Sequence, residues 1–295
     1  MKSPLSLLLT ALSVFAISSP LLAATTAPTV TVEAVQMPAW VEREGGRRTP
    51  VYAGMEVRNR DQLRTGANSR LLLRTADGSS VKLGENAVFS VDNLPPRPGN
   101  VFTASMNVLE GAFRFTTDTL SLFRGKRDVR ITFPMVTTGI RGTDLWGKST
   151  PDRQVICLIE GNIEITPQGE PSIVMNQPLQ FYIRDQGKSL PVAAVDPNQL
   201  RQWATETDIA PGRGAAQRGG RWKVTLATAD TQADALKLYD DVRAAGYPAE
   251  ILPSAAEGGR VYALRLTRLP SRAEAEALAA TLKGRFGITA PRVSM

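Results

Sequence analysis

Residues 221–295 carry the pattern that most constrains how this chain can fold. The run Trp222–Leu226 alternates apolar and polar side chains, which predicts a strand with one buried face. An Ala- and Leu-rich segment follows, with apolar residues at helical spacing and Gly246 as its C-terminal stop. The residues that set this spacing are Ala235, Leu238, Val242 and Ala245.

The same strand-then-helix pattern returns in the second half of this region. Ala249–Leu252 and Val261–Leu266 predict two more strands, and Arg292–Ser294 predicts a fourth. Ser271 is placed to cap a second helix, with Glu274 three residues on, which is the spacing of a capping box. The predicted order is βαββαβ, an α+β ferredoxin-like fold for residues 221–295.

This region resembles the SPOR domain, a small repeat that binds peptidoglycan. The resemblance rests on two half-repeats: Trp222–Leu226 before Ala233–Tyr239, and Val261–Leu266 before Arg272–Leu278. It implies binding to glycan strands from which the stem peptides have been removed.

In a βαββαβ sheet the helices cover one face and leave the other bare. The bare face is predicted to carry Lys223, Thr225, Ala227, Val261, Ala263 and Arg265. Glycan-binding residues implied by the resemblance are Lys223, Thr225, Thr228, Val261 and Arg265. Lys223 and Arg265 could donate charge-assisted hydrogen bonds to the lactyl carboxylates of such a glycan. The alternative is that all five are ordinary solvated residues.

The sequence departs from the SPOR pattern at this face. SPOR domains commonly have Gln at the position of Thr225, an aromatic residue near Val261, Arg at Ala263, and Gly-Pro at Thr267-Arg268. These changes leave open a second hypothesis, in which the SPOR-like fold no longer binds glycan.

Residues 24–185 are predicted to form an all-β domain, a sandwich or a β-roll, because short alternating runs follow one another without an amphipathic helix. The turn Ala76–Ser79 contains Asp-Gly and predicts a hairpin between apolar runs. A second reversal is predicted at Glu160–Asn162.

Four ordered motifs make Thr29 to Pro167 resemble the FecR domain. They lie at Met55–Gly66, Leu71–Gly84, Thr137–Asp144 and Val155–Gly161. The resemblance implies the fold and an envelope location. It does not imply anti-sigma regulation, since the sequence shows no cytoplasmic segment followed by a transmembrane helix.

Within the third FecR-like motif, a structural role is predicted for Gly139, Arg141, Gly142 and Asp144. The glycines permit a bulge or a tight bend in a strand. Arg141 is expected to pair with Asp144 or to donate to nearby carbonyls.

The N-terminus is predicted to be a signal peptide, residues 1–23. Lys2 precedes the apolar run Leu5–Leu22, and cleavage is expected after Ala23 or Ala24, which places the protein in the periplasm. A retained membrane anchor is the alternative. No integral membrane span is expected after cleavage.

Residues 186–220 are predicted to be a linker. A short helix is expected near 197–206, because Asp196 and Pro197 suit the N-cap and first helical positions. The Gly-rich stretch 210–220 then predicts flexibility and the domain boundary.

The residue content excludes most catalytic chemistry. The chain has no histidine and a single cysteine, Cys157, so His-dependent triads and the usual zinc sites are excluded. Gly142–Ser149 matches a P-loop and Ser79–Lys82 matches S-x-x-K, but neither has the required helix after it. We therefore expect no catalytic residue, metal site, cofactor or nucleotide.

The net charge of +7 over 295 residues is spread along the chain, which is not the concentrated basic stripe of a nucleic-acid binder. The sequence predicts a non-catalytic envelope protein that binds peptidoglycan, at division or remodelling sites. The alternatives are a protein–protein scaffold or signalling-related module with a degenerate SPOR fold and, last, a cell-wall hydrolase.

Overall fold

The structure, a computed structural model, describes residues 30–93, 101–118, 125–256 and 259–295. The predicted signal peptide lies outside the described residues. Within the described ranges, no helix is both long and apolar enough to cross a membrane.

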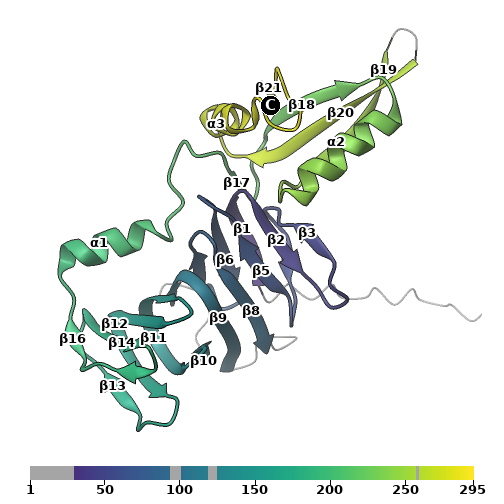
Figure 1. Cartoon of the computed structure of the whole chain (residues 1–295). Helices are drawn as coiled ribbons and strands as arrows, with labels where there is room; N and C mark the ends of the chain where they lie inside the picture. Colours follow the sequence, from purple (N-terminus) through teal and green to yellow (C-terminus); the bar gives the residue numbers. More distant parts are fainter. Residues whose placement is uncertain (1–29, 94–100, 119–124, 257–258) are drawn as a thin grey trace, which may run out of the picture.

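The N-terminal part is rich in β-structure (Figure 1). Strands β1 to β8 are Val30–Gln36, Ala39–Glu42, Arg48–Pro50, Glu56–Val57, Gln62–Thr65, Arg70–Thr75, Ser80–Leu83 and Val88–Asn93. Strands β9 to β16 are Val101–Thr116, Lys126–Phe133, Val136–Ser149, Arg153–Pro167, Ile173–Met175, Gln180–Asp185, Lys188–Ser189 and Ala193–Ala194. Apolar residues at alternate positions of these strands form the core.

Strand β9 joins two sets of strands. Its first half lies between β8 and the parallel strand β10, and its second half lies between β7 and β11. Partners change at Gly111, which has φ of +87°. A Cβ there would lie 2.6 Å from the Ala87 Cα, so only glycine allows this close approach.

The structure confirms one predicted turn and corrects the other. Strands β6 and β7 form the hairpin around Asp77-Gly78, with Leu73 opposite Val81. The predicted reversal at Glu160–Asn162 is wrong, because β12 continues through it as one strand. Gly161, at φ of +98°, lies opposite two residues of β11, Gly142 and Thr143, where the register between the two strands shifts.

Helix α1 (Pro197–Thr205) packs on the β domain. Asp196 is its N-cap and accepts from the Asn198 backbone N–H. The indole rings of Trp203 and Trp146 stack with centroids 4.7 Å apart and planes 3° apart. The salt bridges Lys148–Glu206 and Lys82–Asp208 hold the chain after α1 to β11 and β7, at 2.8 and 2.6 Å.

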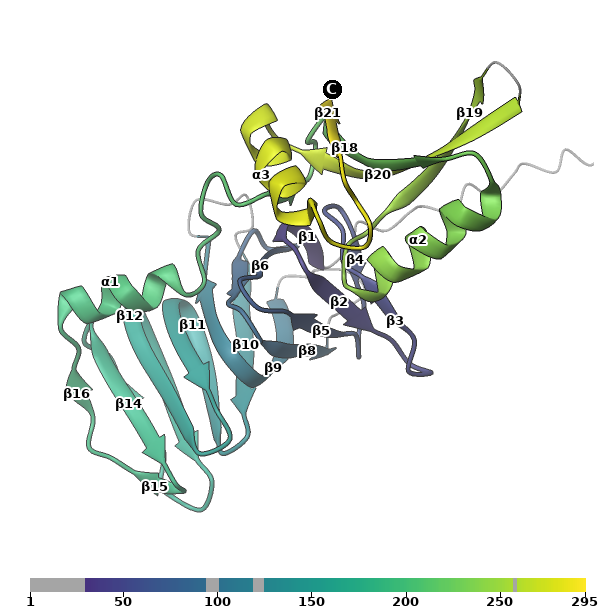
Figure 2. The same ribbon diagram turned by 45° about the horizontal axis from the view of Figure 1, so that its top comes forward.

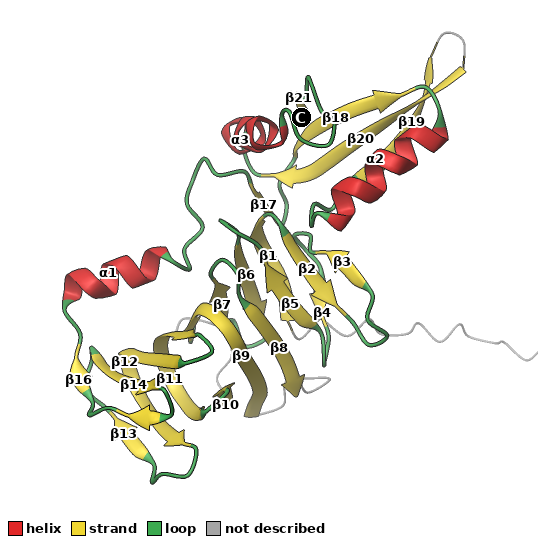
Figure 3. Cartoon of the chain, viewed as in Figure 1, coloured by secondary structure: helices red, strands yellow, loops and turns green. Residues whose placement is uncertain are grey.

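The C-terminal domain combines a four-stranded sheet with two helices, arranged as Figures 2 and 3 show. Its elements are β18 Trp222–Ala229, α2 Gln232–Ala244, β19 Glu250–Ala256, β20 Gly259–Leu269, α3 Arg272–Leu282 and β21 Arg292–Ser294. The sheet order is β19-β20-β18-β21, and all neighbours are antiparallel. This element order is the predicted one.

The segment between the domains is held in place on both sides. Residues Ala215–Gln217 form strand β17, which pairs with β1. On the other side, the Glu274 carboxylate accepts backbone N–H groups from Gly212, Gly214 and Ala215 at 2.6, 2.7 and 3.0 Å. The flexibility predicted from the Gly-rich composition of this segment is therefore wrong, since long-range hydrogen bonds fix it.

The two domains also touch directly. The Trp40 indole N–H donates to the Ala244 carbonyl at 3.0 Å, and the Ala39 N–H donates to the Gly246 carbonyl at 3.2 Å. The Arg268 guanidinium lies over the Tyr52 ring at 4.9 Å. Buried apolar residues of both domains belong to one continuous cluster, so the protein has a shared core.

Candidate functional site

The C-terminal sheet has one covered face and one open face. Side chains on the covered face pack against α2 and α3; these are Val224, Leu226, Leu264 and Leu266 of the sheet with Val242, Ala275, Leu278 and Leu282 of the helices. Helix α2 lies between the sheet and β3, so the covered face is the one toward the β domain (Figure 1). The open face is directed away from it.

A row of four residues crosses the open face. Arg292 lies opposite Thr225, Thr225 opposite Arg265, and Arg265 opposite Glu250, so that all four strands contribute one residue. Residues opposite one another in an antiparallel sheet point to the same side. Lys223 and Ser294 form the neighbouring pair, also on the open side.

A register shift in β18 moves one residue that is predicted on the open face to the covered face. Between Thr225 and Ala227 the pairing with β20 slips, so Ala227 lies opposite the buried Leu264. The prediction that Ala227 lies on the bare face is therefore wrong. After this bulge, Thr228 lies opposite Ala263 and is exposed on the open side.

The cations of the open face have no carboxylate partner in the described part of the chain. Lys223, Arg265 and Arg292 make no salt bridge there. The Arg265 Nε is buried and has no hydrogen-bond acceptor.

Val261 and its neighbours form a more apolar end of the same face. Val261 lies opposite Ser254, and Ala263 lies opposite Leu252, whose side chain is 42% exposed. Val261 lies four positions before Arg265, about 13 Å along a strand. The face thus has a cationic end near β21 and a less polar end near the β19–β20 turn.

Sequence reasoning missed Arg292 and Leu252 as residues of this face. Both lie on strands that the sequence predicts. The face of the sheet to which each side chain points depends on the register with the neighbouring strand. Strand order and register are long-range properties, and the pairing of β21 with β18 rather than with β19 or β20 has no local signal.

The predicted structural motif lies at an irregular part of β11. Gly139 pairs with Arg130 and Glu164, and the register with β12 shifts on both sides of Asp144. Gly142 has φ of +62°. The backbone of Arg141 pairs with Asn162 in this strand.

Asp144 has a different partner from the one predicted. Its carboxylate receives two hydrogen bonds from the Arg114 guanidinium, at 2.9 and 2.6 Å, and one from the Thr116 hydroxyl at 3.1 Å. The hydrogen bonds to Asp144 raise the pKa of Arg114. This pair bridges β9 and β11.

Look-alike catalytic motifs fall in strands or turns. Gly142–Ser149 lies wholly inside β11, so it lacks the loop and helix of a P-loop. Ser79 is buried in the β6–β7 turn, where its hydroxyl donates to Asp77 at 2.6 Å. Lys82 is engaged by Asp208.

The cysteine is also buried. Desolvation, with a smaller effect of Asp144, raises the pKa of Cys157 to about 12. Among the residues that the structure describes, no group of three His, Cys, Asp or Glu side chains could hold a metal ion.

Similarity to known proteins was found at the level of domains and of solved structures. No curated protein matches the chain. Two crystal structures of a candidate anti-sigma factor from Parabacteroides distasonis, at 1.65 and 2.50 Å resolution, are similar at 14% and 15% identity. They cover 75% of this chain and 91% and 89% of their own, with a TM-score of 0.39 each.

The family models match two separate parts of the chain. Residues 61–164 match the FecR protein family, within the region whose four motifs resemble it. Residues 219–290 match the SPOR domain, which includes the open face described above. The chain therefore combines a FecR domain with a SPOR domain.

Proposed function

We propose that this protein is a non-catalytic envelope protein that binds stem-peptide-free glycan strands of peptidoglycan on the open face of its SPOR sheet. The observation that carries the proposal is the row Arg292–Thr225–Arg265, in which two cations without carboxylate partners flank a hydroxyl. Lys223 adds a third cation beside it.

The chemistry of this row suits the proposed ligand. A glycan without stem peptides exposes a lactyl carboxylate on alternate sugars, with hydroxyl and acetamido groups between them. Arginine and lysine donate strong charge-assisted hydrogen bonds to carboxylates. Arg265 and Arg292 lie two strand spacings apart, about 10 Å, which allows each to engage a different sugar.

We propose a ferredoxin-like fold for the SPOR domain and a sandwich or β-roll for the FecR domain. The order β19-β20-β18-β21 and the two helices on one face support the first. We further propose that residues 1–23 export the chain to the periplasm, with action at division or remodelling sites. The apolar run after Lys2 supports export.

Sedimentation with purified sacculi tests the glycan proposal. The chain from Ala24 onward is mixed with sacculi whose stem peptides have been removed by an amidase, and with untreated sacculi. We expect clear co-sedimentation with the treated sacculi and much less with the untreated ones. Equal binding to both, or none, would overturn the proposal.

Two variants place the binding on the sheet. Arg265→Ala is expected to weaken binding at least tenfold, in line with the loss of a charge-assisted hydrogen bond. Arg260→Ala removes the same charge from the same strand, but alternation places residue 260 on the opposite side from residue 265. An equal loss in both variants would contradict binding at the open face.

An interaction scaffold is the second candidate function. Four large apolar side chains on the β-rich part of the chain are exposed, at 44–60% of their area: Val101, Leu109, Val174 and Leu190. Crosslinked envelope partners that persist in the Lys223→Ala/Arg265→Ala variant would favour this function. Turnover of labelled peptidoglycan by the chain would contradict both candidates.

A further inference from the structure

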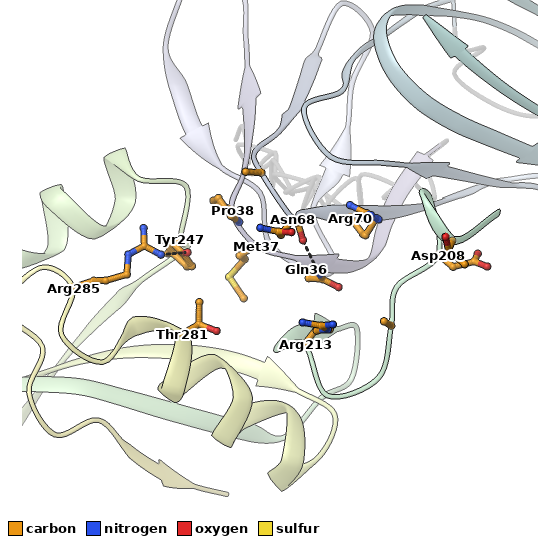
Figure 4. A pocket seen from close by; sticks show the side chains of 13 residues that line it. Gln36, Met37, Pro38, Asn68, Arg70, Asp208, Arg213, Tyr247, Thr281 and Arg285 are labelled. Atoms are coloured by element: carbon orange, nitrogen blue, oxygen red, sulfur yellow. Dashed lines mark hydrogen bonds between the residues drawn. The ribbon is translucent and has the colours of Figure 1, made fainter. Parts of the chain in front are cut away.

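A cavity of about 670 Å³ lies where the FecR domain, the connecting segment and the SPOR domain meet (Figure 4). Its walls come from three parts of the chain. Gln36, Asn68 and Arg70 belong to the FecR domain, and Arg213 to the connecting segment. Tyr247 and Arg285 belong to the SPOR domain. This volume is within the range of sites for small organic ligands.

The cavity carries an excess of positive charge. None of the guanidinium groups of Arg70, Arg213 and Arg285 pairs with a carboxylate among the described residues. The carboxylate in the wall, that of Asp208, is neutralised by Lys82 at 2.6 Å. Three arginines around one cavity with no free carboxylate favour an anionic ligand.

The arginines differ in how they are held. Arg70 donates to the Ser69 carbonyl at 2.7 Å. Arg285 donates to the Tyr247 hydroxyl at 3.0 Å, and its guanidinium lies over the Tyr247 and Phe286 rings. These contacts orient two of the three cations and still leave other N–H groups free to donate.

A second observation at the wall indicates a ligand that also donates hydrogen bonds. The Gln36 side chain is 8% exposed, and its Oε1 is buried with no hydrogen-bond donor. Its Nε2 donates to the Asn68 carbonyl, which fixes the orientation of the amide. A buried acceptor without a donor is rare in folded proteins, and a ligand hydroxyl or N–H would satisfy it.

We propose that this junction cavity is a second binding site, for an anionic sugar that carries a carboxylate or a phosphate. The arginines would hold the anion, and Gln36 would accept from a hydroxyl or an amide N–H. The cavity is separate from the open face of the SPOR sheet, so this proposal does not rest on glycan binding there. Because its walls come from both domains, a bound sugar would also stabilise their arrangement.

Calorimetric titration of the chain from Ala24 onward tests the proposal. The probes are N-acetylmuramic acid as the carboxylate sugar, glucose 6-phosphate as the phosphate sugar, N-acetylglucosamine as a neutral sugar, and inorganic phosphate as a plain anion. We expect at least one anionic sugar to bind at least tenfold more tightly than N-acetylglucosamine and than inorganic phosphate. The better of the two anionic sugars identifies the acid group.

Variants assign that binding to the cavity. Arg213→Ala/Arg285→Ala is expected to weaken it at least tenfold, because two of the three cations around the cavity are lost. Both side chains are exposed, so the variant is expected to fold. Arg47→Ala, at an exposed position away from the cavity, is expected to change it less than twofold. Arg265→Ala is measured in parallel, because Arg265 belongs to the proposed glycan-binding face.

Three results would overturn the proposal. They are the absence of binding by both anionic sugars, binding of inorganic phosphate as tight as that of the better sugar, and a loss caused by Arg265→Ala instead of the double variant. The last result would place the sugar on the open face. Failure of the cavity proposal is distinguishable from failure of the glycan proposal, because the unaltered chain would still co-sediment with amidase-treated sacculi.

Discussion

A buried carboxylate, that of Glu274, is satisfied by the backbone at the junction between the two domains, whereas the cations on the open face of the SPOR sheet have no carboxylate partner among the described residues. At the junction, the carboxylate of Glu274 accepts three backbone N–H groups and is 9% exposed. On the open face, Arg265 has a buried Nε with no acceptor, and Lys223 and Arg292 have no carboxylate partner in the described chain. The difference separates groups that build the fold from groups that remain available to a ligand.

The junction is expected to show the largest effect on stability. Glu274→Ala leaves three backbone donors without their acceptor, two of them on the buried residues Gly214 and Ala215. We expect the free energy of unfolding to fall by about 3 kcal/mol, measured by urea denaturation of the whole chain. Glu276→Ala is the control, because Glu276 lies on the same helix and pairs with Arg272 at the surface.

The control variant is expected to change stability by about 0.5 kcal/mol or less, as for an exposed ion pair. If Glu274→Ala lowers the free energy of unfolding no more than Glu276→Ala does, the hydrogen bonds from the backbone to Glu274 do not stabilise the protein. The contrast between the junction and the open face would then be wrong.

Gly214→Ala is expected to lower the free energy of unfolding by a smaller amount, because the added methyl group would clash with α3. Gly214 has φ of +79°, and a Cβ there would lie 2.9 Å from the Leu278 Cβ and 3.0 Å from the Leu278 backbone. We expect a loss of about 2 kcal/mol by thermal or urea denaturation. Gly212→Ala is the matched control, since Gly212 has φ of +74° and nothing within 4 Å of the added atom, so only about 1 kcal/mol is expected. Equal losses would show that contact with α3 is not what confines the segment.

Arg292→Ala tests whether an unpaired cation of the open face contributes to binding but not to stability. Arg292 is exposed, so stability should be unchanged, while binding to amidase-treated sacculi should weaken about fivefold, as for loss of about 1 kcal/mol. Lys283→Ala removes an exposed charge at the end of α3 and should leave binding unchanged. Unchanged binding in Arg292→Ala would remove β21 from the proposed site.

Cys157 is expected to show the smallest effect, because it belongs to the buried, satisfied part of the molecule. With its pKa raised to about 12 by burial, the folded protein at pH 8 holds roughly one thiolate in ten thousand. Iodoacetamide should therefore leave the native chain unmodified at pH 8 and label it fully in guanidinium, as followed by intact mass. Reactivity of the native thiol should rise only as the pH approaches 12; complete native labelling at pH 8 would contradict the burial.

The sequence predicts local features of this molecule well. Alternation in Trp222–Leu226 and helical spacing around Val242 give the element order of the SPOR domain, because both patterns depend on neighbours a few residues apart. The Asp77-Gly78 turn is predicted for the same reason. These signals need no knowledge of what each strand pairs with.

Features that depend on distant partners could not be predicted. Gly161 has a positive φ that suits a turn or an irregular strand equally, and only the pairing of β12 with β11 shows that the strand continues there. Ala227 changes sides because β18 slips against β20. Glu274 has the spacing of a capping-box residue, and the Ser271 hydroxyl does accept the Glu274 N–H, but the carboxylate is used by residues about sixty positions earlier in the chain.

The candidate site shows the same limit. Lys223, Thr225 and Arg265 are recognisable from strand alternation. Thr228 reaches this face only through the register shift in β18, and Arg292 only through the pairing of β21 with β18. The junction cavity has no sequence signal, since Gln36, Arg213 and Arg285 are far apart in the chain and meet only through the docking of the two domains.

Strand β17 has a consequence for the order in which the chain can complete its fold. β1 pairs with β6 along one edge, while its other edge is covered by β4 at Val30–Thr31 and by β17 at Ala34–Gln36. Residues 215–217 therefore finish a sheet that begins at residue 30, so the edge at Ala34–Gln36 stays open until most of the chain has emerged. An uncovered strand edge is a template for pairing with another chain. A FecR domain cut after α1 would expose that edge permanently and should self-associate, which makes the segment between the domains the cover of that edge.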